Sequence, residues 1–309
     1  MDVFENSKVE RSEGVAHMTV TTKTTTTQSP RRPKVALRNK IPQLIGTLGL
    51  SLIAIIYAFP LVWMTVSGLK TNQQIFREPF ALPETWDFSI WIKAWQVGNI
   101  GQYALNSTIT TSVTVLVILL AGSAAAFAFA RYQFRGRGLL MGLLSLGLLL
   151  PLQSYFIAQS TMFNALYITN TRWALIIPYI AMGLPLATYL LTVYLKALPD
   201  ELFEAARMEG ANDFTIYRLI AMPLLKPGLA TVGIFSALAS WNEFLLALLY
   251  IQDDALKTIP TGLLAFSSRY VTDYGLLFAA LTIITLPMIA IYIAFNKQIV
   301  EGLTAGSLK

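Results

Sequence analysis

The chain has no cysteine, and its single histidine, His17, lies in a polar stretch near the start. Without cysteine there is no disulfide, no thiolate metal site and no cysteine nucleophile. One histidine in such a stretch argues against a histidine-based metal or catalytic site. The sequence therefore predicts no catalytic residues, no metal site and no cofactor bound by this chain.

Charge is scarce as well. Of 309 residues, 13% are charged and 55% are hydrophobic, whereas a soluble domain is roughly 25% charged. The net charge of +6 could suggest nucleic acid, but the basic residues fall between apolar runs, as they do beside membrane spans. The composition predicts an all-α membrane protein whose surroundings are a lipid bilayer, with no nucleic-acid partner.

A phosphate-binding loop is also missing. The nearest stretch, residues 68–71 (Gly-Leu-Lys-Thr), lacks the adjacent Gly-Lys pair and the upstream glycine of such a loop. We therefore expect that the chain does not hydrolyse ATP and is not an enzyme.

Residues 1–33 differ from the rest because they are polar and rich in threonine. They contain no apolar segment of the kind a secretory signal requires. Their composition predicts a disordered cytoplasmic tail, followed by a membrane domain over residues 34–309.

Six apolar stretches are long enough to cross a membrane, which takes about 20 residues. Acidic and basic residues are nearly absent from them, and the exception is Glu243. The predicted spans are roughly 44–67, 108–130, 139–161, 174–195, 228–251 and 275–296.

Lys and Arg residues set the orientation of these spans, because cytoplasmic loops are enriched in them. They are more numerous before the first span, after the second, fourth and sixth, and fewer in the intervening loops. Both termini and the loop 196–227 are therefore expected in the cytoplasm, which agrees with an even number of spans.

The first outer loop, about 70–106, is long and carries Trp86, Trp91 and Trp95. One interpretation is an aromatic belt at the membrane interface. The other is a landing surface for an outer partner, and the two are compatible.

The loop 196–227 predicts two short helices. Asp200 suits the N-cap of the first, Glu201 and Glu204 lie in its first turns, where the helix dipole favours acids, and Arg207 can pair with Glu204. Gly210 suits the left-handed position that follows a helix.

Asn212 or Asp213 can cap the second helix, and Pro223 is expected to end it. A bare connector lying on the bilayer is the simpler interpretation, but acids beside an anionic leaflet are unfavourable. Apolar Leu202 and Phe203 also need cover. A helix docked in a protein groove meets both requirements and is favoured here.

The same loop resembles the EAA loop of permease subunits from binding-protein-dependent ABC importers. Glu209 stands where the family has Asp, and Met222 precedes the first proline, which are mild departures. Further stretches resemble the carbohydrate branch of the type I importers, that of the smaller maltose-system permease, in the same order: 59–63, 106–107, 126–136, 241–244 and 302–306.

This resemblance implies a type I importer permease fold in a bacterial or archaeal cell (inner) membrane. The chain would form half of the pathway of an ATP-driven sugar importer. Its implied partners are a second permease subunit, two ATPase subunits that use ATP and Mg, and an extracytoplasmic sugar-binding protein. The residues implied to couple to the ATPase are Glu204, Ala205, Ala206, Glu209, Gly210 and Pro223.

Two further regions have open interpretations. The tail 302–309 is either a frayed end or a second contact with the ATPase, as its similarity to sugar-importer tails suggests. Polar residues in the outer half of the third and fifth spans either line the translocation pathway or join helices as polar contacts. For Glu243 a structural or partner contact is favoured. The polar residues of the third and fifth spans with these two interpretations are Gln153, Ser154, Tyr155, Gln159, Asn242 and Glu243.

Three alternatives remain. A six-span secondary transporter should carry buried ion-coupling carboxylates or broken half-helices in symmetric positions, and the predicted spans offer only Glu243. A scaffold or insertase needs no solute pathway. An ABC permease for a non-sugar solute or a sugar phosphate is also compatible, and the sequence does not identify the sugar.

Overall fold

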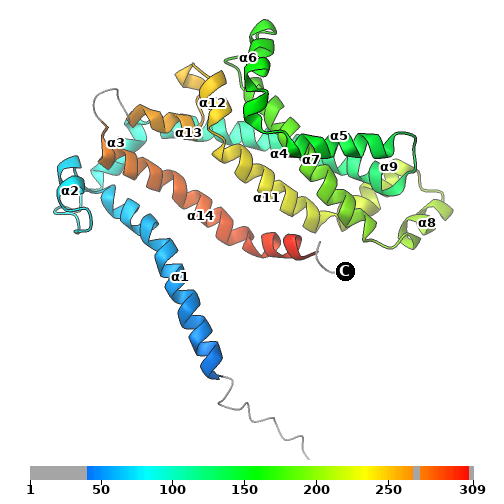
Figure 1. The fold of residues 1–309 in the computed structure, drawn as a ribbon, viewed down its shortest axis with the longest axis horizontal. Helices are drawn as coiled ribbons and strands as arrows, with labels where there is room; N and C mark the ends of the chain where they lie inside the picture. The colour runs from blue at the N-terminus through cyan, green and yellow to red at the C-terminus, as the bar shows by residue number, and fades with distance from the viewer. Residues whose placement is uncertain (1–39, 267–271, 306–309) are drawn as a thin grey trace, which may run out of the picture. The chain divides into compact units, whose positions relative to one another are not determined.

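In the computed structural model of this protein, residues 40–266 and 272–305 are described (Figure 1). The predicted tail 1–33 lies outside them, and so does the end of the C-terminal tail, 306–309. The chain divides into two units, Met1–Ala54 and Ile55–Lys309. The described part of the first unit is the beginning of helix α1; the second unit holds everything discussed below.

The described residues of the membrane domain are mostly helical, as predicted. The elements in chain order are α1 (Lys40–Ser67), α2 (Asn72–Arg77), α3 (Ser89–Val97), α4 (Ile100–Arg131), α5 (Arg137–Leu149), η2 (Leu152–Ser154), α6 (Phe156–Ala165), α7 (Trp173–Lys196), α8 (Glu201–Met208), α9 (Asp213–Ile216), the π-helical η3 (Tyr217–Ala221), α10 (Met222–Leu224), α11 (Lys226–Asn242), α12 (Leu245–Tyr250), η4 (Asp254–Leu256), α13 (Ile259–Gly262), η5 (Leu263–Phe266) and α14 (Tyr274–Ala305).

Among the described residues, three helices are long and apolar enough to cross a membrane unaided: Ile45–Ser67, Ile100–Arg131 and Trp173–Lys196. They correspond to the predicted first, second and fourth spans. The pair Asp213–Leu224 and Lys226–Asn242, bent by 75°, gives a fourth candidate. The helix α5 and the first part of α14 are shorter apolar helices.

Two helices extend beyond the spans predicted within them. The helix α4 begins at Ile100, eight residues before the predicted start of the second span. The helix α14 continues to Ala305, beyond the predicted end near residue 296, so the beginning of the tail is helical. Polar residues extend both helices past their apolar parts, which hydropathy alone does not register.

The third span is not one helix, as the prediction of 139–161 implied. The helix α5 ends at Leu149, Leu150 is extended, and α6 begins at Phe156 after a short 3₁₀ turn. Pro151 explains the break, because proline lacks an N–H and disfavours a helical conformation in the residue before it.

The fifth span is interrupted too. The helix α11 ends at Asn242, Glu243 is extended with φ −69° and ψ 121°, and α12 begins at Leu245. Membrane helices tolerate such breaks where side chains satisfy the freed backbone groups, and the side chain of Glu243 does so here (below).

The centre of the second unit is formed by α4, α7 and α11, which pack along one another. The helices α8 and α9 lie at one end of this group, and α12 and α13 lie toward the other (Figure 1). A buried apolar cluster joins the three long helices to the loop between α7 and α11 through Phe127, Leu191, Leu195, Phe203 and Ile216. The fold therefore places the two regions singled out by the sequence at opposite ends of the same helices.

Candidate coupling loop and translocation cavities

The turn after α8 is formed as predicted. Gly210 adopts a left-handed conformation with φ +84°, which glycine reaches without the clash that a Cβ introduces. Its N–H donates to the Arg207 carbonyl, and the Ala211 N–H donates to the Ala206 carbonyl, 3.0 Å each. These bonds satisfy two of the free carbonyls at the end of α8.

Asp200 occupies the N-cap position of α8, as predicted, but its side chain does not cap the helix. Its backbone is helical, and its side chain makes no cap hydrogen bond. Instead the carboxylate forms an ion pair with Arg131 at the end of α4. A cation from another helix competes for this carboxylate, and a local pattern of residues cannot reveal that.

The second helix is capped by Asn212, one of the two predicted candidates. Its side-chain oxygen accepts from the Thr215 N–H at 2.9 Å. Pro223 does not end this helix, contrary to expectation, because the chain stays helical to Leu224. A π-helical turn over Tyr217–Ala221 ends two residues before the proline, and the bend to α11 follows at Leu225.

The two faces of α8 differ sharply. Phe203 and Ala206 face the core and are 2% and 9% exposed. On the other side Leu202 is 46% and Met208 is 89% exposed. The acidic and small residues predicted to couple are exposed as well: Glu204, Ala205, Glu209 and Gly210.

Arg207 contacts Tyr132 rather than forming the predicted pair with Glu204. Its guanidinium carbon lies 5.9 Å from the centre of the Tyr132 ring, and the ion pairs found among the described side chains do not include Arg207. Burial raises the pKa of the Tyr132 hydroxyl and the nearby Asp213 carboxylate raises it further, which together outweigh the lowering by Arg207. The phenol therefore stays neutral, and the contact is of the cation–π kind.

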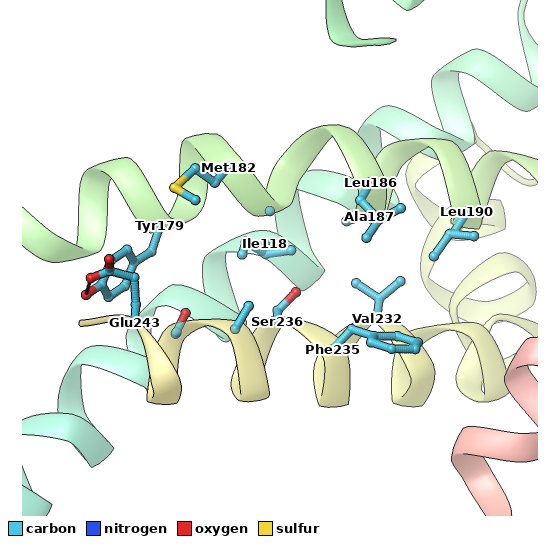
Figure 2. Close-up of a pocket in the computed structure, with 13 residues that line it drawn as sticks. Ile118, Tyr179, Met182, Leu186, Ala187, Leu190, Val232, Phe235, Ser236 and Glu243 are labelled. Atoms are coloured by element: carbon cyan, nitrogen blue, oxygen red, sulfur yellow. Dashed lines mark hydrogen bonds between the residues drawn. The ribbon is translucent and has the colours of Figure 1, made fainter. Parts of the chain in front are cut away.

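A cavity of about 280 Å³ lies where α7 and α11 face each other (Figure 2). Tyr179, Met182, Ser236, Ser240 and Glu243 are among its lining residues. The remaining lining is mainly aliphatic and includes Ile118, Leu186, Leu190, Val232 and Phe235.

Glu243 sits at one end of this cavity and holds the helix break together. Its carboxylate accepts hydrogen bonds from the Tyr179 hydroxyl at 2.7 Å, from the Leu246 N–H at 2.9 Å and from the Ala247 N–H at 3.2 Å. The two amides are free donors at the start of α12, where the helix dipole also favours an acid. The geometry thus provides a structural contact for Glu243, the interpretation favoured from the sequence, in a side chain that also lines the cavity.

A second cavity, of about 340 Å³, contains two of the predicted pathway residues. Tyr155 and Gln159 line it together with Gly147, Pro178 and Met182. The Gln159 side-chain oxygen accepts from the Tyr250 hydroxyl at 2.9 Å. Both residues face a cavity, and Gln159 also joins α6 to α12.

The other predicted pathway residues lie elsewhere. Ser154 is exposed, and its hydroxyl donates to the Pro151 carbonyl at 2.7 Å. Asn242 is exposed, and its amide donates to Leu238 in its own helix. The side chain of Gln153 lies outside the described part of the structure, so that prediction stays a prediction.

The sequence did not predict three polar residues that line the first cavity: Tyr179, Ser236 and Ser240. Ser236 and Ser240 are four residues apart and therefore lie on one face of α11, and Glu243 follows directly after the end of this helix. That spacing was a usable signal. Tyr179 had none, because its neighbours in α7 are apolar in every direction.

The outer loop keeps both of its interpretations. It contains α2 and α3, and Phe80 and Trp86 are 77% and 58% exposed. Lys70 anchors it, being 1% exposed and donating to the carbonyls of Glu78 and Pro79 at 3.3 and 3.1 Å. Exposed aromatic side chains fit a membrane belt and a landing surface equally.

Comparison with known proteins gives one consistent family. Residues 118–304 match the family described as "Binding-protein-dependent transport system inner membrane component". The "Probable ABC transporter permease protein YurM" of Bacillus subtilis is 37% identical over 85% of this chain and 86% of its own length. The "Diacetylchitobiose uptake system permease protein NgcG" of Streptomyces coelicolor is 33% identical over 83% of this chain and 85% of its own.

A third relative is the "Trehalose/maltose transport system permease protein MalG" of Thermococcus litoralis, 32% identical over 87% of this chain and 98% of its own length. Among solved structures, a chain from the "Crystal structure of a bacterial ABC transporter involved in the import of the acidic polysaccharide alginate" superposes with a TM-score of 0.72. That match has 19% identity and covers 86% of this chain and 99% of the other, which establishes the fold.

The family match covers more than half of the chain, and the fold agrees with it. Members of this family are transport components that work with a second permease, an ATPase and a solute-binding protein. The chain belongs to the inner membrane components of binding-protein-dependent transport systems and is an ABC importer permease.

Proposed function

We propose that this permease serves a sugar importer, forms one half of its translocation pathway, and receives the work of ATP hydrolysis through α8 and the Gly210 turn. The observation that carries this proposal is the exposed surface of α8. This surface carries both apolar and acidic side chains. On the opposite face of α8, Phe203 and Ala206 are buried against the rest of the protein.

The exposed surface of α8 suits a protein groove better than lipid or water. Met208 at 89% exposure and Leu202 at 46% are unfavourable in water. Exposed Glu201, Glu204 and Glu209 are unfavourable against an anionic leaflet. An amphipathic helix laid in a groove buries the apolar side chains and leaves acids for basic residues at the rim.

The complex that follows has this chain, a second permease subunit, two ATPase subunits and an extracytoplasmic sugar-binding protein. ATP and Mg are used by the ATPase, because this chain has no phosphate-binding loop. The cavities between α5, α6, α7 and α11 would form this chain's wall of the pathway.

A sugar is supported as the solute by two observations. The names of the relatives concern diacetylchitobiose, trehalose and maltose, multiple sugars and arabinooligosaccharides. In the 340 Å³ cavity, Tyr155 offers an aromatic face and Gln159 an amide, the groups that pack against a sugar ring and bond its hydroxyls.

The docking surface is tested with the double substitution Leu202→Glu and Met208→Glu. It should leave membrane insertion intact but reduce co-purification of the ATPase at least tenfold, the effect of about 1.4 kcal/mol of lost binding. The matched control is Phe134→Glu, an apolar side chain 38% exposed outside α8, which should retain the ATPase. Normal co-purification by the double variant would overturn the assignment of this surface.

The solute is tested by deleting the gene for this chain, restoring it, and measuring uptake of a panel of labelled sugars and sugar phosphates. We expect restored uptake of a sugar, and loss of that uptake when the partner ATPase is inactivated. Uptake that survives ATPase inactivation but collapses with the ion gradient would support a secondary transporter instead.

A further inference from the structure

The cytoplasmic end of α4 contacts both arms of the loop 196–227, which is the proposed coupling loop. The side chain of Arg131, the last residue of α4, is 5% exposed. It pairs with Asp200, just before α8, and donates to the carbonyls of Leu195 and Leu198, the latter at 3.3 Å. Its guanidinium carbon lies 3.7 Å from the centre of the Phe203 ring in α8.

A second contact joins α4 to the other arm of the loop. The Tyr217 hydroxyl in η3 and the Ser123 hydroxyl in α4 are 2.8 Å apart, and the rings of Tyr217 and Phe127 are 5.5 Å apart. Both arms of the loop are therefore held by a helix that neither enters nor leaves it.

The outer end of α4 is also held by hydrogen bonds that its buried side chains make to other segments. Asn106 is fully buried, and its amide donates to the carbonyls of Ala255 at 2.8 Å and Lys257 at 3.0 Å. Its side-chain oxygen accepts from Arg172, directly before α7, at 3.0 Å. The neighbouring Ser107 hydroxyl accepts from the Ile259 N–H at 2.9 Å.

Between these ends α4 and α7 approach closely. A Cβ built on Gly122 of α4 would lie 3.0 Å from the Cβ of Ala187 of α7, so the two backbones come nearer than larger residues permit. Arg131 bonds the end of α7, and Arg172 bonds α4 at the beginning of α7. The helices α4 and α7 are therefore joined to each other at both ends and in the middle.

We propose that α4 and α7 form one rigid beam that carries the movement of the coupling loop to the outer segment 251–259, with Arg131 and Asn106 as the positioning residues at its two ends. This inference rests on the proposed coupling role of α8. Because linkage is reciprocal, an event at the outer segment reaches the ATPase by the same beam. Contacts built on the buried side chains of Arg131 and Asn106 suit this task, because packed elements switch between discrete arrangements instead of deforming continuously.

The beam is tested by spin-label distances in the assembled transporter, reconstituted in lipid. Because the chain contains no cysteine, two cysteines can be introduced as the sole sites for thiol-reactive spin labels. The first pair is Glu201→Cys on α8 and Leu105→Cys at the outer end of α4, both exposed. The second pair is Glu201→Cys and Ile293→Cys on α14, where Ile293 is 69% exposed.

Between the nucleotide-free and ATP-bound states, the first distance should stay constant within the roughly 1–2 Å of ordinary helix shifts, while the second changes by more. A change in the first distance that matches or exceeds the second would overturn the beam. No change in either distance would overturn it too, since no movement would reach α4. Sugar uptake by the unsubstituted complex separates these outcomes from failure of the proposed function.

Arg131→Ala and Asn106→Leu should each lower the stimulation of ATP hydrolysis by the loaded binding protein about tenfold, within the range of typical coupling. Arg131→Lys keeps the charge but lacks the planar guanidinium, whose two terminal nitrogens bond Asp200 and the two carbonyls separately, so it should fall between. The control is Arg135→Ala, which removes an exposed arginine from the next loop. Full stimulation in Arg131→Lys and Arg131→Ala, with both proteins assembled, would overturn the role of Arg131.

Discussion

Gly210 shows how much a single residue contributes here through its backbone alone. Its φ is +84°, and a Cβ built on it meets no atom within 4 Å. A larger side chain would therefore have room, and only the backbone conformation opposes it. Under the proposed coupling role, a substitution at this position acts through the angle between α8 and α9 and not through packing.

Gly210→Val should abolish sugar uptake while the protein still reaches the membrane. A β-branched residue in this conformation is strained by about 1–3 kcal/mol, and relief of that strain rotates α8 relative to α9. Gly210→Asn should keep most of the uptake, because Asn tolerates a positive φ. Uptake and ATPase co-purification are the measurements.

The matched control is Gly136→Val. Gly136 has φ +87° and equally open surroundings, but it lies in the turn before α5. It should suffer the same strain and retain coupling. Equal loss of uptake in both variants would mean that general destabilisation, not the coupling turn, explains the result.

Glu243→Leu should lower the melting temperature of the purified complex. It leaves the Tyr179 hydroxyl and two amides without their acceptor, and each unsatisfied buried group costs about 1–3 kcal/mol. Glu243→Gln should be milder, because its carbonyl oxygen still accepts. Asn242→Leu is the control, since Asn242 bonds only its own helix; an equal shift there would remove the special role of Glu243.

At the scale of elements, two of the predicted spans are broken. The separation of α5 from α6 at Pro151 and of α11 from α12 at Glu243 gives the outer ends of these spans their own short helices. Tyr155 and Gln159 reach a cavity because α6 starts anew after the break.

The helices of the predicted first, second and fourth spans followed from hydropathy, and the Gly210 turn and Asn212 cap followed from local residue preferences. What the sequence did not predict depends on contacts between distant segments. Asp200 forms an ion pair with Arg131, which is 69 residues away in the sequence, and Glu243 accepts a hydrogen bond from Tyr179, which is 64 residues away. Pro223 was misjudged because a preceding π turn accommodates it, and a single proline carries no signal of that.

Tyr155→Cys and Gln159→Cys should react with a membrane-impermeant thiol reagent, and their reactivity should change with nucleotide. Both line the 340 Å³ cavity, and polar side chains are unfavourable against lipid. Ile157→Cys is the control on the same helix, because Ile157 is exposed but outside the cavity lining. If the two sites stay inert in every nucleotide state, the polar residues only join helices.

At the scale of the whole molecule, basic residues mark one side of the membrane. The turn with Arg135 and Arg137, and the coupling loop with Arg207 and Arg218, belong to that side. The segments 78–88 and 251–258 belong to the other. An asymmetry of this kind orients a membrane protein during insertion.

A fluorescent reporter fused after Lys309 should therefore be active in the cytoplasm. A phosphatase that folds only outside the cytoplasm should be active when inserted at 253–255, an exposed stretch, and inactive when inserted at 135–137. Phosphatase activity at 135–137 would reverse the orientation and separate α8 from any cytoplasmic ATPase.

Among the described residues, Met182 lines both cavities: the one against α11, shown in Figure 2, and the one against α6. Methionine is unbranched and has three rotatable side-chain bonds, so it adapts its shape without backbone movement. Because Met182 borders both cavities, a change of its rotamer would alter the space in each of them at once. Isoleucine at this position would remove that freedom, because its side chain is branched at Cβ and stiff.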